Sequence, residues 1–248
     1  RTLLKASLQE ARRKKQFPAG PLRVAVDTLC INGAGAVKDT WNLLAGGIWQ
    51  VIQAAAAGTR EAPADWAARH ELTAYLPQRH GSVKGDLDLD WNDPAARQAA
   101  LATITTAAQR TLQAAGELVA TLAEAEAAPV RAAATLLSDL LGQDVETSDD
   151  QDGNSHPQIK RGTAPNRIPS ATDPEQRHGR KSKRQRFTGH KARTLVETES
   201  GLILDTEVLP GNAGDGQDVV AHLEGAQDTS GNNQRIEIWE EFKQSIGG

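Results

Sequence analysis

The sequence contains 248 residues, of which 24% are charged, and its formal net charge is −4. This length allows one large domain or two small ones with a substantial buried core. No run of about 18 apolar residues is present, which argues against a membrane-spanning helix. The single cysteine excludes a disulfide framework and a zinc site made of several cysteines. We therefore expect a cytoplasmic protein.

The chain begins with Arg1 and contains no methionine. We therefore expect it to be a piece of a longer reading frame or a processed product. A function that needs residues outside this piece would look incomplete in it.

The first expected elements are a helix and a strand. Residues 1–21 are basic and helix-prone up to Pro18, and we interpret them as the helical end of an upstream region. Leu22–Asp27 reads LRVAVD, an apolar run with β-branched residues that predicts a buried strand ending on a carboxylate. A glycine-rich turn follows, so residues 22–37 are expected to be the first strand and turn of the core.

Residues 38–142 predict a large helical insertion. Asp39 is expected to be the N-cap of a helix that ends near Gly58. Asp65 is expected to cap a short helix. Asp93 directly precedes a proline, which is the arrangement of an N-cap followed by proline at the first helical position.

Two further patterns belong to this helical insertion. Trp41 and Trp49 fall near the apolar face of the first helix, which indicates core packing rather than base stacking. Another helix is expected to begin at Pro129 and to end at Gly142. After Asp93, apolar residues recur three and four positions apart, which predicts one buried helix face: Leu101, Ile104, Ala108, Leu112, Ala115, Val119 and Leu122.

The composition changes at Gln143. Residues 143–176 are acidic and polar and are expected to form an exposed loop. Residues 177–224 follow, and we expect them to supply a basic segment, two strands and a helix. The final residues, 225–248, have weak patterning and are left as an uncertain tail.

The two later strands are expected at Lys191–Glu197 and Leu202–Val208, joined by a turn at Glu199–Gly201. Asp215 precedes the expected helix, and an aspartate in that place is more often an N-cap than a metal ligand.

The basic segment runs from Arg177 to Arg193 and reads RHGRKSKRQRFTGHKAR, with eight lysines and arginines, two histidines and no acid. Like charges that lie this close repel each other and destabilise a compact state. Contact with nucleic-acid phosphates would relieve that repulsion. A solvated loop or a targeting patch would also accommodate the charge, so charge alone leaves these readings open.

The amino-acid sequence of several segments narrows the choice of function. The segments that carry it are Asp27-Thr28, the Gly33/Gly35 turn, Asp39-Thr40-Trp41-Asn42-Leu43-Leu44, Asp173-Pro174, His178-Gly179-Arg180-Lys181-Ser182, Phe187, Gly189-His190-Lys191, Leu202-Ile203-Leu204, and Pro210-Gly211-Asn212 with Asp215. In this order they resemble insertion-sequence transposases of the DDE class, over about Leu22 to Leu223. Singly each segment is a weak signal, and their combination is specific.

The resemblance implies a metal-dependent enzyme that cleaves and transfers DNA strands. It implies a ribonuclease-H-like fold in which three carboxylates hold two Mg²⁺ ions, which activate the attacking group and stabilise the leaving oxygen. Asp27 would be the first catalytic carboxylate and metal ligand. The expected partners are transposon ends, target DNA and a second copy of the chain. The expected DNA-binding residues are Arg180, Lys181, Lys183, Arg184, Arg186 and Lys191.

The other two carboxylates are missing from the pattern. No strand after Leu223 matches the second catalytic aspartate, and the context of Glu237, Glu240 and Glu241 does not match the third position. Asp205 stays unassigned. We therefore expect a fragment that stops before the second catalytic aspartate.

The expected fold is α/β, with a partial ribonuclease-H-like mixed sheet and a large helical insertion between the first and second strands. We expect one composite domain that holds Asp27 beside the two later strands. Two other functions stay open. The chain could be a non-catalytic nucleic-acid-binding remnant, which the missing carboxylates favour, or a helical adaptor whose basic loop is a surface patch.

Overall fold

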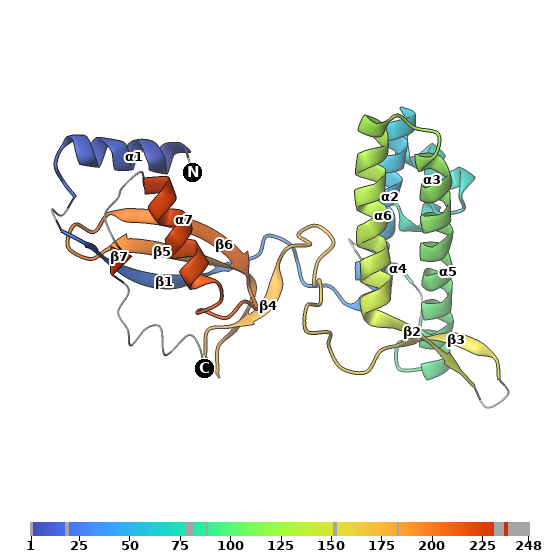
Figure 1. Ribbon diagram of the computed structural model, residues 1–248. Helices are drawn as coiled ribbons and strands as arrows, with labels where there is room; N and C mark the ends of the chain where they lie inside the picture. The colour runs from blue at the N-terminus through green and yellow to red at the C-terminus, as the bar shows by residue number, and fades with distance from the viewer. Residues whose placement is uncertain are drawn as a thin grey trace. The chain divides into compact units, whose positions relative to one another are not determined.

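The computed structural model describes residues 2–17, 20–77, 82–87, 89–150, 153–182, 184–230 and 236–237. The chain divides into two compact units rather than the one composite domain that we expected. We call residues 1–33 with 177–248 the sheet unit, and residues 34–176 the helical unit (Figure 1). The mixed α/β class predicted from the sequence is confirmed.

The sheet unit is built on a mixed sheet (Figure 1). Strand β1 (Leu22–Asn32) pairs antiparallel with β5 (Arg186–Glu197). On its other side β1 pairs parallel with β7 (Ile236–Glu237). Strand β5 also pairs antiparallel with β4 (Arg177–Arg180) and β6 (Ile203–Pro210). The long strand β5 is therefore the common partner of the three antiparallel pairs.

Two helices, α1 (Thr2–Arg13) and α7 (Val219–Ser230), contribute to the apolar core beside this sheet. The core is small, because few residues of the unit are both apolar and buried. The buried members of this core are Leu8, Leu22, Leu195, Leu204, Val219 and Leu223.

Strand β1 alternates in burial along its length, as expected for a strand with one covered face. Leu22, Val24 and Val26 belong to the apolar core, whereas Asp27 is exposed. The prediction that the strand ends at Asp27 is wrong, because β1 continues to Asn32. The register with β5 keeps Asp27 in mid-strand, opposite Thr194.

The helical unit contains three long helices that pack on one another, α2 (Thr40–Thr59), α5 (Pro94–Val119) and α6 (Glu124–Asp144) (Figure 1). Short helices α3 (Pro63–Arg69) and α4 (Val83–Asp86), and a one-turn 3₁₀ helix at Thr73–Tyr75, lie between α2 and α5 in the chain. Among the described residues, no helix combines the length and the apolar character that crossing a membrane requires.

Two of the predicted helix starts are confirmed. The Asp39 carboxylate accepts a hydrogen bond from the Asn42 backbone N–H, and the Asp93 carboxylate accepts one from Ala95 N–H, so both cap their helices. The cap predicted at Asp65 is wrong, because α3 begins at Pro63 with Ala62 at its N-cap.

The predicted start and end of α6 are also wrong. The helix begins at Glu124 and contains Pro129, which costs one backbone hydrogen bond. Burial of Val130, Leu137 and Leu140, all 0% exposed, outweighs that loss. The helix continues past Gly142 to Asp144.

The loop expected at 143–176 contains a β-hairpin instead. Strands β2 (Val145–Asp149) and β3 (Ser155–Ile159) pair antiparallel, with acidic side chains on the exposed positions of β2. Asp144 is buried, and Arg167 donates hydrogen bonds to its carboxylate from Nε at 2.8 Å and from a terminal nitrogen at 2.6 Å. Acidic composition therefore did not prevent regular structure here.

The chain leaves the sheet unit and returns to it beside the same part of β5. The Gly33 backbone N–H donates to the Thr188 carbonyl at 2.9 Å, and Arg177 is paired with Gly189. The two ends of the helical unit are also tied together, since the Gln176 side chain donates to the Gly35 carbonyl at 2.9 Å.

Candidate nucleic-acid interface

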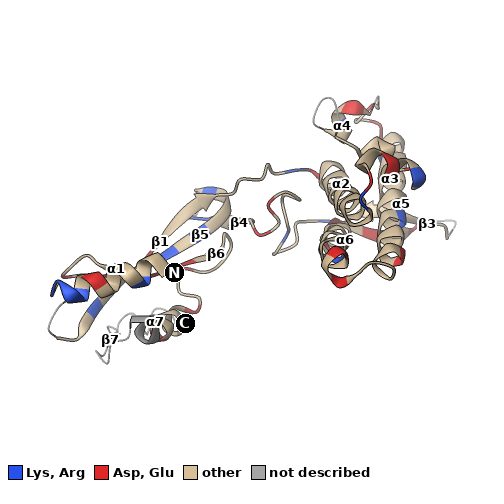
Figure 2. Ribbon diagram, turned by 90° about the horizontal axis from the view of Figure 1, so that it is seen from above, with Lys and Arg blue, Asp and Glu red and all other residues tan. Residues whose placement is uncertain are grey.

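Residues 177–189, which we call the basic hairpin, form the most positively charged part of the sheet unit. Strand β4 and the start of β5 are joined by a turn in which the Lys181 backbone N–H donates to the Gln185 carbonyl at 2.9 Å. Arg180 lies directly opposite Arg186 across the two strands. Figure 2 marks lysines and arginines in blue and shows several of them on the strands of this unit.

Four cations of the basic hairpin are exposed and have no ion-pair partner among the described residues: Arg180, Lys181, Arg184 and Arg186. Two arginines directly opposite each other destabilise a strand pair. The repulsion is not offset by a neighbouring carboxylate of the described chain. The arrangement therefore suits an external anion. Lys183, which we also expected to bind DNA, lies outside the described residues.

The basic hairpin has two different faces. Paired residues share a face and successive residues alternate, so Arg180 and Arg186 lie on the same face as His178 and Thr188. The His178 Nδ1 and the Thr188 hydroxyl are 2.9 Å apart on that face. Gly179 and Phe187 form the opposite face. Arg180 and Arg186 thereby share one face, whereas Arg177, paired with Gly189, belongs to the other.

Three glycines fix the base of the basic hairpin. A Cβ atom on Gly179 would lie 2.1 Å from the carbonyl oxygen of Gly211, and one on Gly211 would lie 2.5 Å from the carbonyl oxygen of Gly189. A Cβ atom on Gly189 would lie 2.0 Å from the Ile31 carbonyl oxygen. Such distances are below any real contact, so only glycine permits this close backbone packing. All three glycines belong to the motif series found in the sequence.

Lys191 also holds this base together and is not a surface residue. Lys191 is 5% exposed. Its Nζ donates hydrogen bonds to the Ala213 carbonyl and to the Asp215 carboxylate, both at 2.7 Å. The expected DNA contact of Lys191 is therefore wrong for this conformation. Asp215 is not an N-cap either, because α7 begins only at Val219.

A second group of buried charges joins α7 to β5 and β6. Arg193 is fully buried, and its Nε donates to the Glu207 carboxylate at 2.5 Å. The two ring nitrogens of His222 lie 2.8 Å from Glu207 Oε1 and 3.2 Å from Asp205 Oδ2. We call these four residues the buried charge cluster.

Sequence reasoning missed the buried charge cluster. Asp205 and Glu207 are two residues apart and therefore lie on one face of β6. That spacing is visible in the sequence, but nothing in it names Arg193 and His222 as their partners. The cluster connects three consecutive elements, β5, β6 and α7, and its role in the described structure is to fix α7 against the sheet.

Glu197 closes the turn between β5 and β6. Its carboxylate accepts hydrogen bonds from the Ser200 backbone N–H and hydroxyl, both at 2.7 Å, and from the Glu199 N–H at 3.1 Å. Burial alone would raise the pKa of Glu197. The hydrogen bonds from Ser200 and Glu199 outweigh burial and hold that pKa below its ordinary value of 4.5.

Asp27, the expected catalytic carboxylate and metal ligand, stands alone. Its Oδ1 accepts a hydrogen bond from the Thr28 backbone N–H at 2.8 Å, and the residue is exposed. Within the described ranges, no group of three or more His, Cys, Asp or Glu side chains could hold a metal ion. The described residues therefore do not fit a two-Mg²⁺ site. Glu240 and Glu241 lie outside them, as does the side chain of Glu237.

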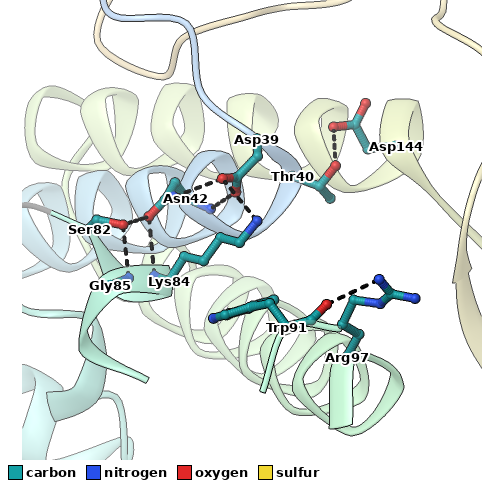
Figure 3. Close-up of polar contacts among 9 residues, drawn as sticks. All are labelled: Asp39, Thr40, Asn42, Ser82, Lys84, Gly85, Trp91, Arg97 and Asp144. Carbon is teal, nitrogen blue, oxygen red and sulfur yellow. Dashed lines mark hydrogen bonds and ion pairs between the residues drawn. The ribbon is translucent and has the colours of Figure 1, made fainter. Parts of the chain in front are cut away.

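The motif at Asp39–Leu44 serves the helical unit (Figure 3). The Asn42 side-chain amide donates to the Asp39 carboxylate at 3.1 Å and its carbonyl accepts from the Ser82 hydroxyl at 3.0 Å. The Lys84 ammonium lies 3.9 Å from the Asp39 carboxylate and 4.6 Å from the centre of the Trp91 ring. These contacts attach α4 to the start of α2, so the motif has a structural role in this unit.

The prediction that Trp41 and Trp49 pack against the core is confirmed, since both are partly buried beside it. Thr40 links the start of α2 to the end of α6, because its hydroxyl donates a hydrogen bond to the Asp144 carboxylate at 3.0 Å (Figure 3).

A scan against models of known protein families found no match, and searches of curated proteins and of solved structures found none either.

Proposed function

We propose that the chain is part of a DDE-class insertion-sequence transposase and that it binds DNA through the basic hairpin. The observation that carries the proposal is the base of this hairpin. The backbones of the motif residues Gly179 and Gly189 each approach Gly211 closely, and Lys191 is paired with Asp215. These contacts bring the motif residues of β4, β5 and the turn after β6 to one corner of the sheet unit.

The order of the strands supports a ribonuclease-H-like core. That fold begins with three antiparallel strands, followed by a helix and a fourth strand that lies parallel to the first. In the sheet unit β1, β5 and β6 are antiparallel neighbours, and α7 leads to β7, which is parallel to β1. The basic hairpin and the helical unit lie between the first two of these strands in the chain.

Strand cleavage and transfer are proposed for the complete enzyme in the cytoplasm. Asp27 is our candidate for its first carboxylate. Two further carboxylates and Mg²⁺ would be needed, and the described residues do not supply that set. No catalytic step is therefore assigned to this chain by itself.

The isolation of Asp27 favours a second candidate, a non-catalytic nucleic-acid-binding remnant. The two candidates share DNA binding and differ in catalysis. The reading frame downstream of Gly248 separates them, because a catalytic aspartate strand and a glutamate-bearing helix would restore the enzyme, whereas a stop codon would leave the remnant.

Salt dependence of DNA binding tests the shared part of both candidates. If four phosphates contact the four exposed cations, the logarithm of the binding constant should fall with the logarithm of salt concentration at a slope of about −4. Fluorescence anisotropy with a labelled 30-base-pair duplex would measure it. The test variant replaces Arg180, Lys181, Arg184 and Arg186 with glutamine, and its slope should approach zero.

A matched control removes the same number of charges elsewhere. The control variant replaces Arg13, Arg69, Arg110 and Arg131 with glutamine. Each of these arginines already has a carboxylate partner, so its loss should leave the slope near that of the unaltered chain. Equal slopes in the two variants would contradict the proposal. Failure of the unaltered chain to bind at moderate salt would favour the helical adaptor instead.

A further inference from the structure

We propose that the basic hairpin is a two-stranded ribbon that enters the major groove of B-form double-stranded DNA and contacts it with the face that carries Arg180 and Arg186. The inference rests on the DNA binding proposed above and adds the form of the nucleic acid, the groove and the contacting face.

The shape of the basic hairpin suits the major groove. A major groove about 12 Å wide admits a two-stranded β-ribbon in undeformed B-form DNA, whereas the minor groove, about 6 Å wide, must be widened or bent to admit one. Strands β4 and β5 form such a ribbon at Arg177–Gly189, where each strand supplies four paired residues. The turn at its end holds Lys181 and Arg184, both exposed, beside the phosphates that such an entry would meet.

The contacting face carries groups that bind anions and guanine bases. Arg180 and Arg186 point from the same face, one from each strand, and neither has a carboxylate partner among the described residues. A guanidinium donates two parallel hydrogen bonds to guanine O6 and N7 or to a phosphate. Two facing guanidinium groups repel each other when no anion is present, and a polyanion removes that repulsion.

The base of the basic hairpin is already rigid. Gly179 and Phe187 turn the opposite face toward the backbone of Gly211, where the close approach leaves no room for another side chain. Lys191 locks the same turn through the Ala213 carbonyl and Asp215. A ribbon held in this way loses little conformational freedom when it binds.

Single strands and RNA duplexes fit the basic hairpin less well than duplex DNA does. Proteins that bind single strands stack bases on exposed aromatic rings. The one aromatic ring of the paired strands besides His178 is Phe187, and it packs over Gly179 on the opposite face. The major groove of A-form RNA is too deep and narrow for side chains to reach. Duplex DNA is the partner that fits both observations.

Competition among three ligands tests the inference with the full chain. We expect a 30-base-pair DNA duplex to bind roughly tenfold or more tightly than the RNA duplex of the same sequence or the single DNA strand. Methylation of guanine N7, which lies in the major groove, should weaken binding. Saturating the minor groove with netropsin should not compete.

Charge-preserving variants separate the face from simple electrostatics. Arg180→Lys combined with Arg186→Lys keeps both charges, so the salt slope should persist while the preference for DNA over duplex RNA falls several-fold. Arg69→Lys with Arg110→Lys is the control and should retain the full preference. Circular dichroism would check that each variant is folded.

The outcomes distinguish the two proposals. Salt-sensitive binding with equal affinity for DNA and RNA duplexes, or without any effect of N7 methylation, would overturn the groove inference and leave the proposed DNA binding standing. The absence of binding to every ligand would overturn both.

Discussion

The two units of the molecule are stabilised by different kinds of buried groups. The helical unit has a large apolar core to which α2, α5 and α6 contribute, including Ile48, Ile52 and Leu137 at 0% exposed. Among the described residues, the sheet unit has a small apolar core and buries five lysine, arginine, histidine, aspartate or glutamate side chains beside it, whereas the helical unit buries one, Asp144. The five in the sheet unit are Lys191, Arg193, Glu197, Asp205 and His222.

This difference determines how each unit can fail. Apolar burial is distributed over many side chains, and each contributes a few kcal/mol at most. Buried charges cost several kcal/mol of desolvation each unless every partner is in place. The sheet unit therefore depends on a few specific pairs, and the loss of one partner should affect it more than the loss of one methyl-rich side chain affects the helical unit.

The largest expected effect comes from Arg193→Met. It leaves Glu207 without its arginine partner and removes the hydrogen bond to the Gln217 carbonyl, and the free energy of unfolding of the sheet unit should fall by about 3–5 kcal/mol. Hydrogen exchange followed by mass spectrometry should show faster exchange in β5 and β6 but not in α2 and α6. Arg69→Met is the control, because its pair with Glu61 is exposed and is worth at most about 1 kcal/mol. Unchanged exchange in β5 would show that the cluster does not stabilise the unit.

Leu137→Ala should have the next largest effect, and in the other unit. The side chain is 0% exposed in the apolar core, so its truncation should cost about 2–5 kcal/mol. Urea unfolding followed by tryptophan fluorescence would detect the change through Trp41, Trp49 and Trp66. Leu136→Ala, at a partly buried neighbouring position, should cost less. Equal costs would argue against a tightly packed core at this level.

The smallest effect concerns acid stability. The pKa of Glu197 is lowered in the folded state, so its contribution to stability is present above the ordinary value of 4.5 and is lost as the pH falls through the lowered value. Glu197→Gln should flatten the loss of sheet-unit stability as the pH falls below about 5. Thermal unfolding at a series of pH values would measure the slope. An identical slope in the variant would exclude Glu197 as its source.

Local signals predicted much of the fold. Asp39 and Asp93 act as caps because the capping hydrogen bond spans only two or three residues. Strands β5 and β6 and the turn between them were predicted from alternation and from the residues at 199–201. In each of these places the deciding partner is near in the sequence.

The errors occurred where the deciding partner is distant. Pro129 is tolerated inside α6 because that helix packs on α2 and α5, and Asp144 is paired with Arg167 and Thr40. The site shows the same limit. The basic composition predicted exposed cations, but nothing local distinguishes the exposed Arg186 from the buried Lys191, whose environment is created by the turn at Ala213–Asp215.

The junction at Gly33 and Arg177 has a consequence for how the sheet unit tolerates changes in the helical unit. Both residues adjoin the same point of β5, and Gln176 and Gly35 are hydrogen-bonded to each other on the other side of the junction. A chain that enters and leaves at one point can gain or lose the intervening module with little change in the loop-closure entropy of its host. Replacing the helical unit with a short linker between Gly33 and Arg177 should therefore leave the register of the sheet unchanged.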